Sequence, residues 1–273
     1  MADDLHRPVA AAFFDLDKTV IDRASIVAFS AAFRKGGLIS RRTMLRALAA
    51  QLRYVRAGAD DERLGEIREA MLRLTRGWDR QQVRDIVRAS LLRTVEPILY
   101  AEAVELIEQH RRAGERVYLV SASPDEIVAP LAELLGADGA IASQGEVDDA
   151  GRYTGAMTTY VYGASKASAV VELAAAVGID LARSTAYSDS ATDVPMLEAV
   201  GRPVVVNPDR ALARIARQRD WEVRRFTKPV GLGNRVSART PVVTGSLALA
   251  GAAVYLWRHG PRSRTQSQLR SAT

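Results

Sequence analysis

The segment Val9–Phe14 reads VAAAFF and runs directly into Asp15-Leu16-Asp17-Lys18-Thr19. A short apolar run that stops at a carboxylate is typical of a buried parallel strand whose carboxyl end opens into a site. Two carboxylates two residues apart at such an end can point into one pocket and share a hard divalent cation. Alone, this pattern also fits a solvated acidic loop, so the rest of the chain has to decide between the two interpretations.

Similar apolar runs recur later and alternate with segments of helical spacing. The predicted strands are 116–121 (RVYLVS), 184–188 (STAYS) and 203–206 (PVVV), and the predicted helices are 101–113, 125–135 and 165–177. Each helix is followed by a glycine, where a residue in the left-handed conformation would close it. Strands and helices in alternation predict a parallel α/β sheet.

Two segments interrupt this alternation. Between about Asp22 and Pro97, apolar residues recur at helical spacing with arginines between them, which predicts a helical module inserted after the first strand. The segment 143–163 alternates in character around Asp149-Ala150-Gly151, which predicts a β-hairpin. We therefore expect a core made of 9–21 and 98–228, and a helical cap made of 22–97.

The composition excludes several classes of site. The 273 residues include no cysteine, which excludes a disulfide framework, a thiolate metal site, an iron–sulfur cluster and a cysteine nucleophile. The three histidines lie far apart and show no zinc spacing. The net charge of +6 comes from arginines that are spread along predicted helices and form no single tract, so we expect no nucleic-acid partner.

The two ends of the chain bear on its localisation. Asp3 and Asp4 stand where a secretory signal carries basic residues, so we expect the body of the chain in the cytoplasm. The segment 240–257 has no charged residue and, at about 1.5 Å per residue, would form a helix of about 27 Å, near the minimum for crossing a bilayer. We expect a single membrane anchor there, followed by a polar tail, 258–273. A buried helix or a partner-binding segment is the alternative.

Polar residues also follow the second predicted strand. Ser123 and Glu126 fit a capping box, with Pro124 at the first helical position. Ser121 would then stand just before a helix N-terminus, a place that favours phosphate. The plain alternative is an ordinary strand-to-helix turn.

Two further groups complete the pattern. Lys166 opens a predicted helix and is one of only four lysines, although a surface position is the default for any single lysine. Asp189 and Asp193 follow the strand STAYS and put two more acids at a strand end. A pure capping role is the alternative for either aspartate, but it leaves the gathering of four acids at strand ends unexplained.

Taken in order, these motifs resemble those of the haloacid dehalogenase superfamily, over roughly 9–226. The resemblance is to the phosphatase branch with a helical cap after the first motif, subfamily IB, which includes phosphoserine phosphatases. It implies a Rossmann-like parallel sheet with an α-helical cap. It also implies a Mg²⁺-dependent phosphomonoester hydrolase that acts through an aspartyl-phosphate on a small phosphorylated metabolite or a lipid headgroup.

The resemblance further implies a role for each motif residue. Asp15 would be the nucleophile, and Asp17 the general acid and base. The phosphate would be held by Thr19, Ser121, Ala122 and Lys166. Mg²⁺ would be bound by the Asp15 carboxylate, the Asp17 backbone carbonyl and Asp189, with Asp193 supporting this cluster without touching the ion.

Departures from the phosphoserine phosphatase pattern concern the substrate. Ala24 stands where those enzymes have an acidic residue that reads the substrate ammonium, and Ala122 and Ser123 replace two glycines of their second motif. Ser188 and Thr192 stand where Gly and Asn are common. Phosphoserine is therefore a doubtful substrate. Anion readers in the helical insert could be Arg23, Arg34 and Lys35, although solvated surface roles are the default for each.

Three functions stay open at this point. The first is the phosphomonoester hydrolase, with a phosphoserine phosphatase proper as a variant of it. The second is a catalytically silent, membrane-associated scaffold, which loss of a motif residue would favour. The third is a phosphotransferase that passes the phosphoryl group to an acceptor other than water.

Overall fold

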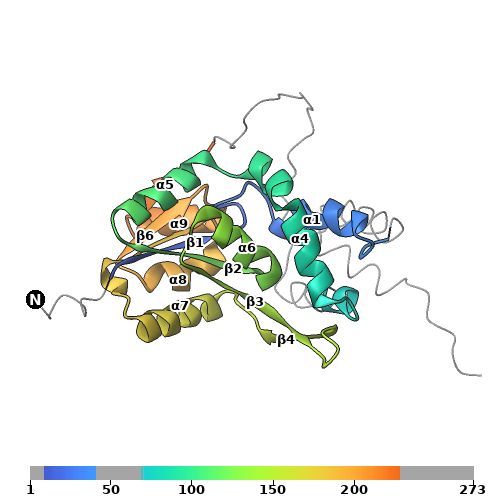
Figure 1. Ribbon diagram of the computed structural model, residues 1–273. Helices are drawn as coiled ribbons and strands as arrows, with labels where there is room; N and C mark the ends of the chain where they lie inside the picture. Colours follow the sequence, from blue (N-terminus) through green and yellow to red (C-terminus); the bar gives the residue numbers. More distant parts are fainter. Residues whose placement is uncertain (1–8, 41–68, 70, 228–273) are drawn as a thin grey trace, which may run out of the picture. The chain divides into compact units, whose positions relative to one another are not determined.

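The computed structural model describes residues 9–40, 69 and 71–227 (Figure 1). The chain divides into two compact units, the first made of Met1–Ile39 and Thr75–Gly245 and the second of Ser40–Leu74 and Ser246–Thr273. Nearly all described residues belong to the first unit. In the second unit the structure describes only residues 40, 69 and 71–74, of which 69 and 71–74 are helical.

A parallel-dominated sheet of seven strands forms the centre of the first unit, in the order β4-β3-β2-β1-β5-β6-β7. Only the pairing of β3 with β4 is antiparallel among these strands. The strands are β1 (Ala11–Asp15), β2 (Arg116–Pro124), β3 (Gly139–Val147), β4 (Tyr153–Thr159), β5 (Thr185–Ser188), β6 (Arg202–Val206) and β7 (Glu222–Arg224). The four predicted strands and the hairpin are confirmed, whereas β7 was not predicted.

Alternate residues of the central strand, β1, pack into two separate hydrophobic cores, because successive side chains of a strand point to opposite faces of the sheet. Phe14 packs with α5 (Ala101–Arg112) and α6 (Asp125–Leu135) on one face of the sheet. Phe13 packs on the other face, with α7 (Ala164–Val177), α8 (Val194–Glu198) and α9 (Arg210–Gln218). The result is a Rossmann-like arrangement of helices on both faces of the sheet (Figure 1).

Glycines end the three predicted helices as expected. Gly136 and Gly178 are the C-caps of α6 and α7, with φ of 67° and 72°. Gly114 follows the end of α5 with φ of 74°. These left-handed conformations strain residues that carry a Cβ, which is why glycine marks the helix ends in the sequence.

Helices also lie between β1 and β2, where the sequence predicts the insert. These are α1 (Ser25–Lys35), α4 (Arg80–Val95) and the short 3₁₀ helix η2 (Glu96–Ile98). Phe29 and Phe33 of α1 and Val83 and Val87 of α4 share the core that α6 covers. The rest of the predicted insert, 41–68 and 70, lies outside the described residues.

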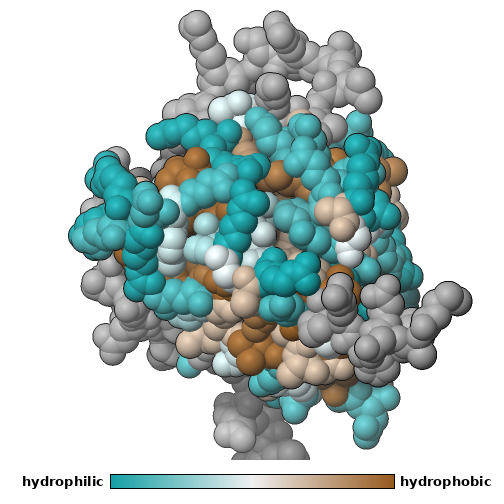
Figure 2. Space-filling model, turned by 90° about the vertical axis from the view of Figure 1, so that its left-hand side faces the viewer, coloured by the Kyte–Doolittle hydropathy of each residue, from teal (hydrophilic) through white to brown (hydrophobic). Residues whose placement is uncertain are grey.

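Figure 2 shows the face of the molecule that lies at the left of Figure 1; it is mainly hydrophilic, with hydrophobic residues in smaller groups. No helix among the described residues is long and apolar enough to cross a membrane. The predicted anchor, 240–257, and the polar tail, 258–273, lie outside the described residues.

Candidate active site

The first site residues meet where three neighbouring strands end. Asp15 is the last residue of β1, Ser121 lies in β2, and Asp189 directly follows β5. Because β1 pairs with both β2 and β5 in parallel, their carboxyl ends share one edge of the sheet. All three side chains are buried. Asp15 therefore belongs to an enclosed site and not to a solvated loop.

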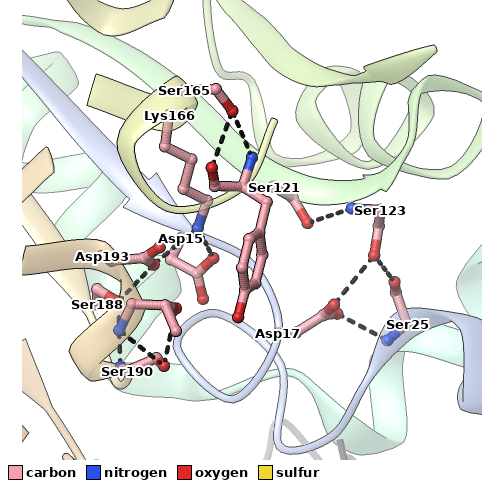
Figure 3. A network of polar contacts seen from close by, with 12 residues as sticks. Asp15, Asp17, Ser25, Ser121, Ser123, Ser165, Lys166, Ser188, Ser190 and Asp193 are labelled. Atoms are coloured by element: carbon pink, nitrogen blue, oxygen red, sulfur yellow. Dashed lines mark hydrogen bonds and ion pairs between the residues drawn. The ribbon is translucent and has the colours of Figure 1, made fainter. Parts of the chain in front are cut away.

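Lys166, from the first turn of α7, joins two acids of this site (Figure 3). Its Nζ lies 2.5 Å from Asp15 Oδ1 and 2.7 Å from Asp193 Oδ2. Asp193 Oδ2 also accepts a hydrogen bond from Ser188 Oγ at 2.7 Å. Lys166 is only 3% exposed, so the surface-lysine alternative is wrong.

The electrostatics of the site follow from placing three buried acids, and the partly buried Asp17, around one buried lysine. Burial lowers the pKa of Lys166, but the carboxylates of Asp15 and Asp193 more than reverse this, so its pKa is raised and its charge retained. Burial also raises the pKa of Asp15, with Lys166 opposing the shift and the other acids reinforcing it. Burial is the main cause that raises the pKa of Asp189 to about 7.

Asp17 lies beside this group and has partners of its own. Its Oδ1 accepts a hydrogen bond from the Ser25 backbone N–H at 2.7 Å, and its Oδ2 accepts one from Ser123 Oγ at 3.0 Å. Burial raises the pKa of Asp17, while the bonds from Ser25 and Ser123 lower it in part. Asp17 is thus held through both carboxyl oxygens.

The predicted capping box is wrong. Pro124 is the N-cap of α6, and no side chain caps that helix. The Ser123 hydroxyl is bonded instead to Asp17 and Ser25, and the Glu126 carboxylate to Arg80 Nε at 2.6 Å. Strand β2 also continues to Pro124, which leaves Ser121 four residues before the first helical residue. The polar groups that a local cap would use therefore form hydrogen bonds with residues distant in the sequence.

The remaining predicted residues are placed as follows. Thr19 is fully buried, and its hydroxyl has no hydrogen-bond partner among the described residues. Ala122 lies in β2 between Ser121 and Ser123. Arg23 forms an ion pair with the neighbouring Asp22 at 2.6 Å, and its side chain is 53% exposed. Sequence reasoning missed Ser25, because it belongs to no motif and its side-chain partner, Ser123, lies 98 residues away.

The acids fit a hard divalent cation. Within the described part of the chain, no three acidic or histidine side chains gather closely enough to hold an ion by side chains alone. The expected set needs fewer, since it uses two carboxylates and one backbone carbonyl, and Mg²⁺ in proteins keeps several water ligands. Three buried acids, Asp15, Asp189 and Asp193, and the partly buried Asp17 face one buried lysine, which leaves an excess of negative charge that a cation would balance.

Comparisons with known proteins agree with this geometry. The model of the haloacid dehalogenase-like hydrolases matches residues 12–198. The chain is 51% identical, over 84% of its length and 83% of the relative, to an inhibition of morphological differentiation protein from Streptomyces azureus. It is 46% identical, over 90% of its length and 85% of the relative, to a probable phosphatase from Mycobacterium tuberculosis.

Two further similarities are informative. A phosphoserine phosphatase from Mycobacterium tuberculosis is 36% identical over 80% of the chain and 71% of its own length. A crystal structure of a protein of unknown function from Bordetella pertussis matches with a TM-score of 0.67 and 31% identity, covering 79% of this chain and 98% of that one.

The chain therefore belongs to the haloacid dehalogenase-like hydrolases. Within them it is an enzyme of the phosphatase branch and is similar to phosphoserine phosphatases. The resemblance read from the motifs is confirmed at this level, and the silent-scaffold alternative is set aside.

Proposed function

We propose that this phosphatase hydrolyses phosphomonoesters through a phosphoryl group carried on Asp15. The observation that carries the proposal is the buried contact of Lys166 with Asp15 and Asp193, set beside Asp17 at one sheet edge. Phosphoryl transfer depends on positioning and on stabilisation of charge, and this arrangement supplies both.

The reaction takes two steps. A carboxylate oxygen of Asp15 attacks the phosphorus while the ester P–O bond breaks, and Asp17 gives its proton to the leaving alcohol oxygen. Water then attacks the aspartyl-phosphate, Asp17 takes a proton from that water, and inorganic phosphate leaves. Both carboxyl groups return to their starting states, so the net change is consumption of one water for each ester cleaved.

Charge in the site has to be balanced during attack. A carboxylate that approaches a phosphate dianion meets a repulsion of about 4 kcal/mol per unit charge at 4 Å, for an effective dielectric constant of about 20. Lys166 carries a retained positive charge within 2.5 Å of the nucleophile. Mg²⁺, when bound by the Asp15 and Asp189 carboxylates and the Asp17 carbonyl, would supply further positive charge at the phosphate oxygens.

The substrate proposed is a small phosphorylated metabolite. Similarity to a phosphoserine phosphatase supports an ester of this size, with phosphoserine itself as the variant to test. Ala24 offers no carboxylate for a substrate ammonium. We therefore expect hydrolysis of phosphoserine to be weaker than that of esters without an ammonium group.

The test is phosphate release from a panel of phosphomonoesters, with and without Mg²⁺. We expect Mg²⁺-dependent release that falls by at least about 1,000-fold in Asp15→Asn, because an amide cannot attack phosphorus as a carboxylate does. Asp85→Asn, on the exposed side of α4, is the matched control and should keep full activity. Equal activity of Asp15→Asn and the whole protein would contradict the proposal.

An added acceptor alcohol separates hydrolysis from phosphotransfer. A hydrolase releases inorganic phosphate at the same rate with or without the alcohol. A phosphotransferase forms a new phosphate ester in proportion to the acceptor, and that result would replace water as the proposed acceptor.

A further inference from the structure

The hydrogen bonds around Asp17 link three separate segments of the chain. Asp17 lies in the loop after β1, Ser123 near the end of β2, and Ser25 at the first position of α1. The hydroxyls of Ser25 and Ser123 lie 2.7 Å apart, and both residues are buried, with exposures of 0% and 8%. Figure 3 shows the Asp17 carboxyl turned toward these two serines.

We propose that Ser123 and Ser25 are positioning residues for Asp17. This inference rests on the proposed function, in which Asp17 donates and accepts the proton. Two contacts, one on each carboxyl oxygen, fix the plane of the carboxyl group. Each oxygen keeps a second lone pair, which is where the proton for the leaving group can reside.

The chemistry of hydroxyl groups suits this task. A serine hydroxyl can donate or accept, so the Ser25–Ser123 pair can direct its hydrogens toward Asp17 or away from it. When Asp17 is a carboxylate, Ser25 donates to Ser123 and Ser123 donates to Asp17. When Asp17 carries its proton on the second lone pair of an oxygen, the bonds from Ser123 and from the Ser25 backbone N–H persist. The same two residues therefore hold Asp17 on either side of the proton transfer.

Ser123 also contacts the second motif. Its backbone N–H donates to Ser121 Oγ at 3.0 Å, while its side chain reaches Asp17. One residue thus connects the serine proposed to hold phosphate with the residue proposed to move the proton. A glycine at this position would keep the first contact and lose the second.

The experiment compares two esters that differ in leaving group. An alkyl alcohol needs a proton as it departs, whereas p-nitrophenolate departs without one. The measured quantity is kcat/KM, which covers the steps through cleavage of the ester bond. For Ser123→Ala we expect kcat/KM to fall by about 10- to 100-fold with the alkyl phosphate and by under about 3-fold with p-nitrophenyl phosphate. The loss with the alkyl phosphate is a fraction of the rate enhancement that a general acid usually provides.

The second step of the reaction, hydrolysis of the aspartyl-phosphate, gives an independent measurement with p-nitrophenyl phosphate. Hydrolysis of the aspartyl-phosphate also needs Asp17, now as a base, so kcat for p-nitrophenyl phosphate should fall in Ser123→Ala even where kcat/KM does not. Ser25→Ala should show a smaller loss, because Ser123 Oγ and the backbone N–H of residue 25 still donate to Asp17. The double variant should be no worse than Ser123→Ala, since the two hydroxyls act in one chain.

Controls separate positioning from a structural role. Ser90→Ala removes another buried serine hydroxyl, which bonds Ile86 O within α4, and should leave both substrates unaffected. Ser123→Thr keeps the hydroxyl and should restore the alkyl phosphate to within about 3-fold of the original protein. If circular dichroism shows that Ser123→Ala does not fold, Ser123→Cys, which is closer in size to serine, takes the place of the alanine variant in this test.

The outcomes are distinct. Equal losses of kcat/KM with both esters, or a gain in Ser123→Ala, would overturn the positioning role while Asp15-dependent hydrolysis stands. A wild-type protein that cleaves neither ester with Mg²⁺ would overturn the proposed function and this inference together. A loss confined to the alkyl ester in Ser123→Ala, restored in Ser123→Thr, supports the inference.

Discussion

Lys166 is a buried structural contact as well as a proposed phosphate-binding residue. It is 3% exposed and lies between Asp15 and Asp193, so neither acid is left without a counter-charge. Lys166→Met should lower kcat by about 100- to 1,000-fold, the effect of removing one preorganised donor from a phosphate-binding site. Phosphate release under saturating Mg²⁺ measures this loss.

Lys166→Met should also lower the stability of the protein, because breaking a buried ion pair leaves uncompensated charge. We expect the free energy of unfolding of Lys166→Met, measured in urea without Mg²⁺, to fall by about 3 kcal/mol. Lys35→Met, at the exposed end of α1, is the control and should change it by under about 0.5 kcal/mol. Activity of Lys166→Met within tenfold of the original would rule out its proposed role.

At the scale of elements, an ion pair joins α4 and α6, and only its acidic partner is buried. Glu126 is 2% exposed, and its Oε1 lies 2.6 Å from Arg80 Nε. Its Oε2 has no hydrogen-bond partner among the described residues. Arg84 lies 4.0 Å from the same Oε1 and offers only a weaker contact.

Arg80→Met should therefore lower the free energy of unfolding by about 2 kcal/mol, the cost of a buried acceptor without its partner. Replacing both partners, in Arg80→Met with Glu126→Met, should recover most of that loss, since the unpaired carboxylate is then gone. Urea unfolding of the two single variants and the double variant measures the coupling. Additive losses would show that the two side chains do not act as a pair.

The edge between β6 and β7 should respond to pH. Hydrogen bonding to Arg202 is the main cause that lowers the pKa of Glu222, and Arg224, 2.6 Å away, adds to it. A lowered pKa in the folded state adds stability above the pKa of the unfolded state, about 4.3 for glutamate, and the gain is lost as pH falls through the folded pKa.

The difference in Tm between the original protein and Glu222→Gln should accordingly be constant above about pH 5.5 and shrink as the pH falls below about 4.3. Glu172→Gln, on the exposed side of α7, controls for loss of a surface carboxylate. Thermal unfolding across this pH range makes the measurement. A Tm difference that grows on acidification would contradict the assigned ion pairs.

At the scale of the whole molecule, the strands and the meeting of the motifs were predictable because both follow from short-range patterns. Apolar runs marked β1, β2, β5 and β6, and parallel pairing brings their carboxyl ends to one edge. Strand β7 has only three residues, which is too short for its sequence to show the pattern of a strand.

Long-range polar partners were not predictable in the same way. The spacing of Ser123 and Glu126 suits a local cap, yet their partners, Asp17 and Arg80, lie 106 and 46 residues away. Ser25 has no motif of its own, and only the fold brings it to Asp17. A pattern within four residues cannot show which of two possible partners a hydroxyl will take.

The central place of β1 in the sheet bears on how the protein is made on the ribosome. Ala11 pairs with Arg116, and Ala12 with Thr185, so β1 is synthesised before both of its neighbours and has to wait for them. Sheets with such distant pairing form slowly, and their unpaired edges are exposed to aggregation meanwhile. The nascent chain therefore carries Asp15 long before its partners, and the site can form only after Asp193 has emerged.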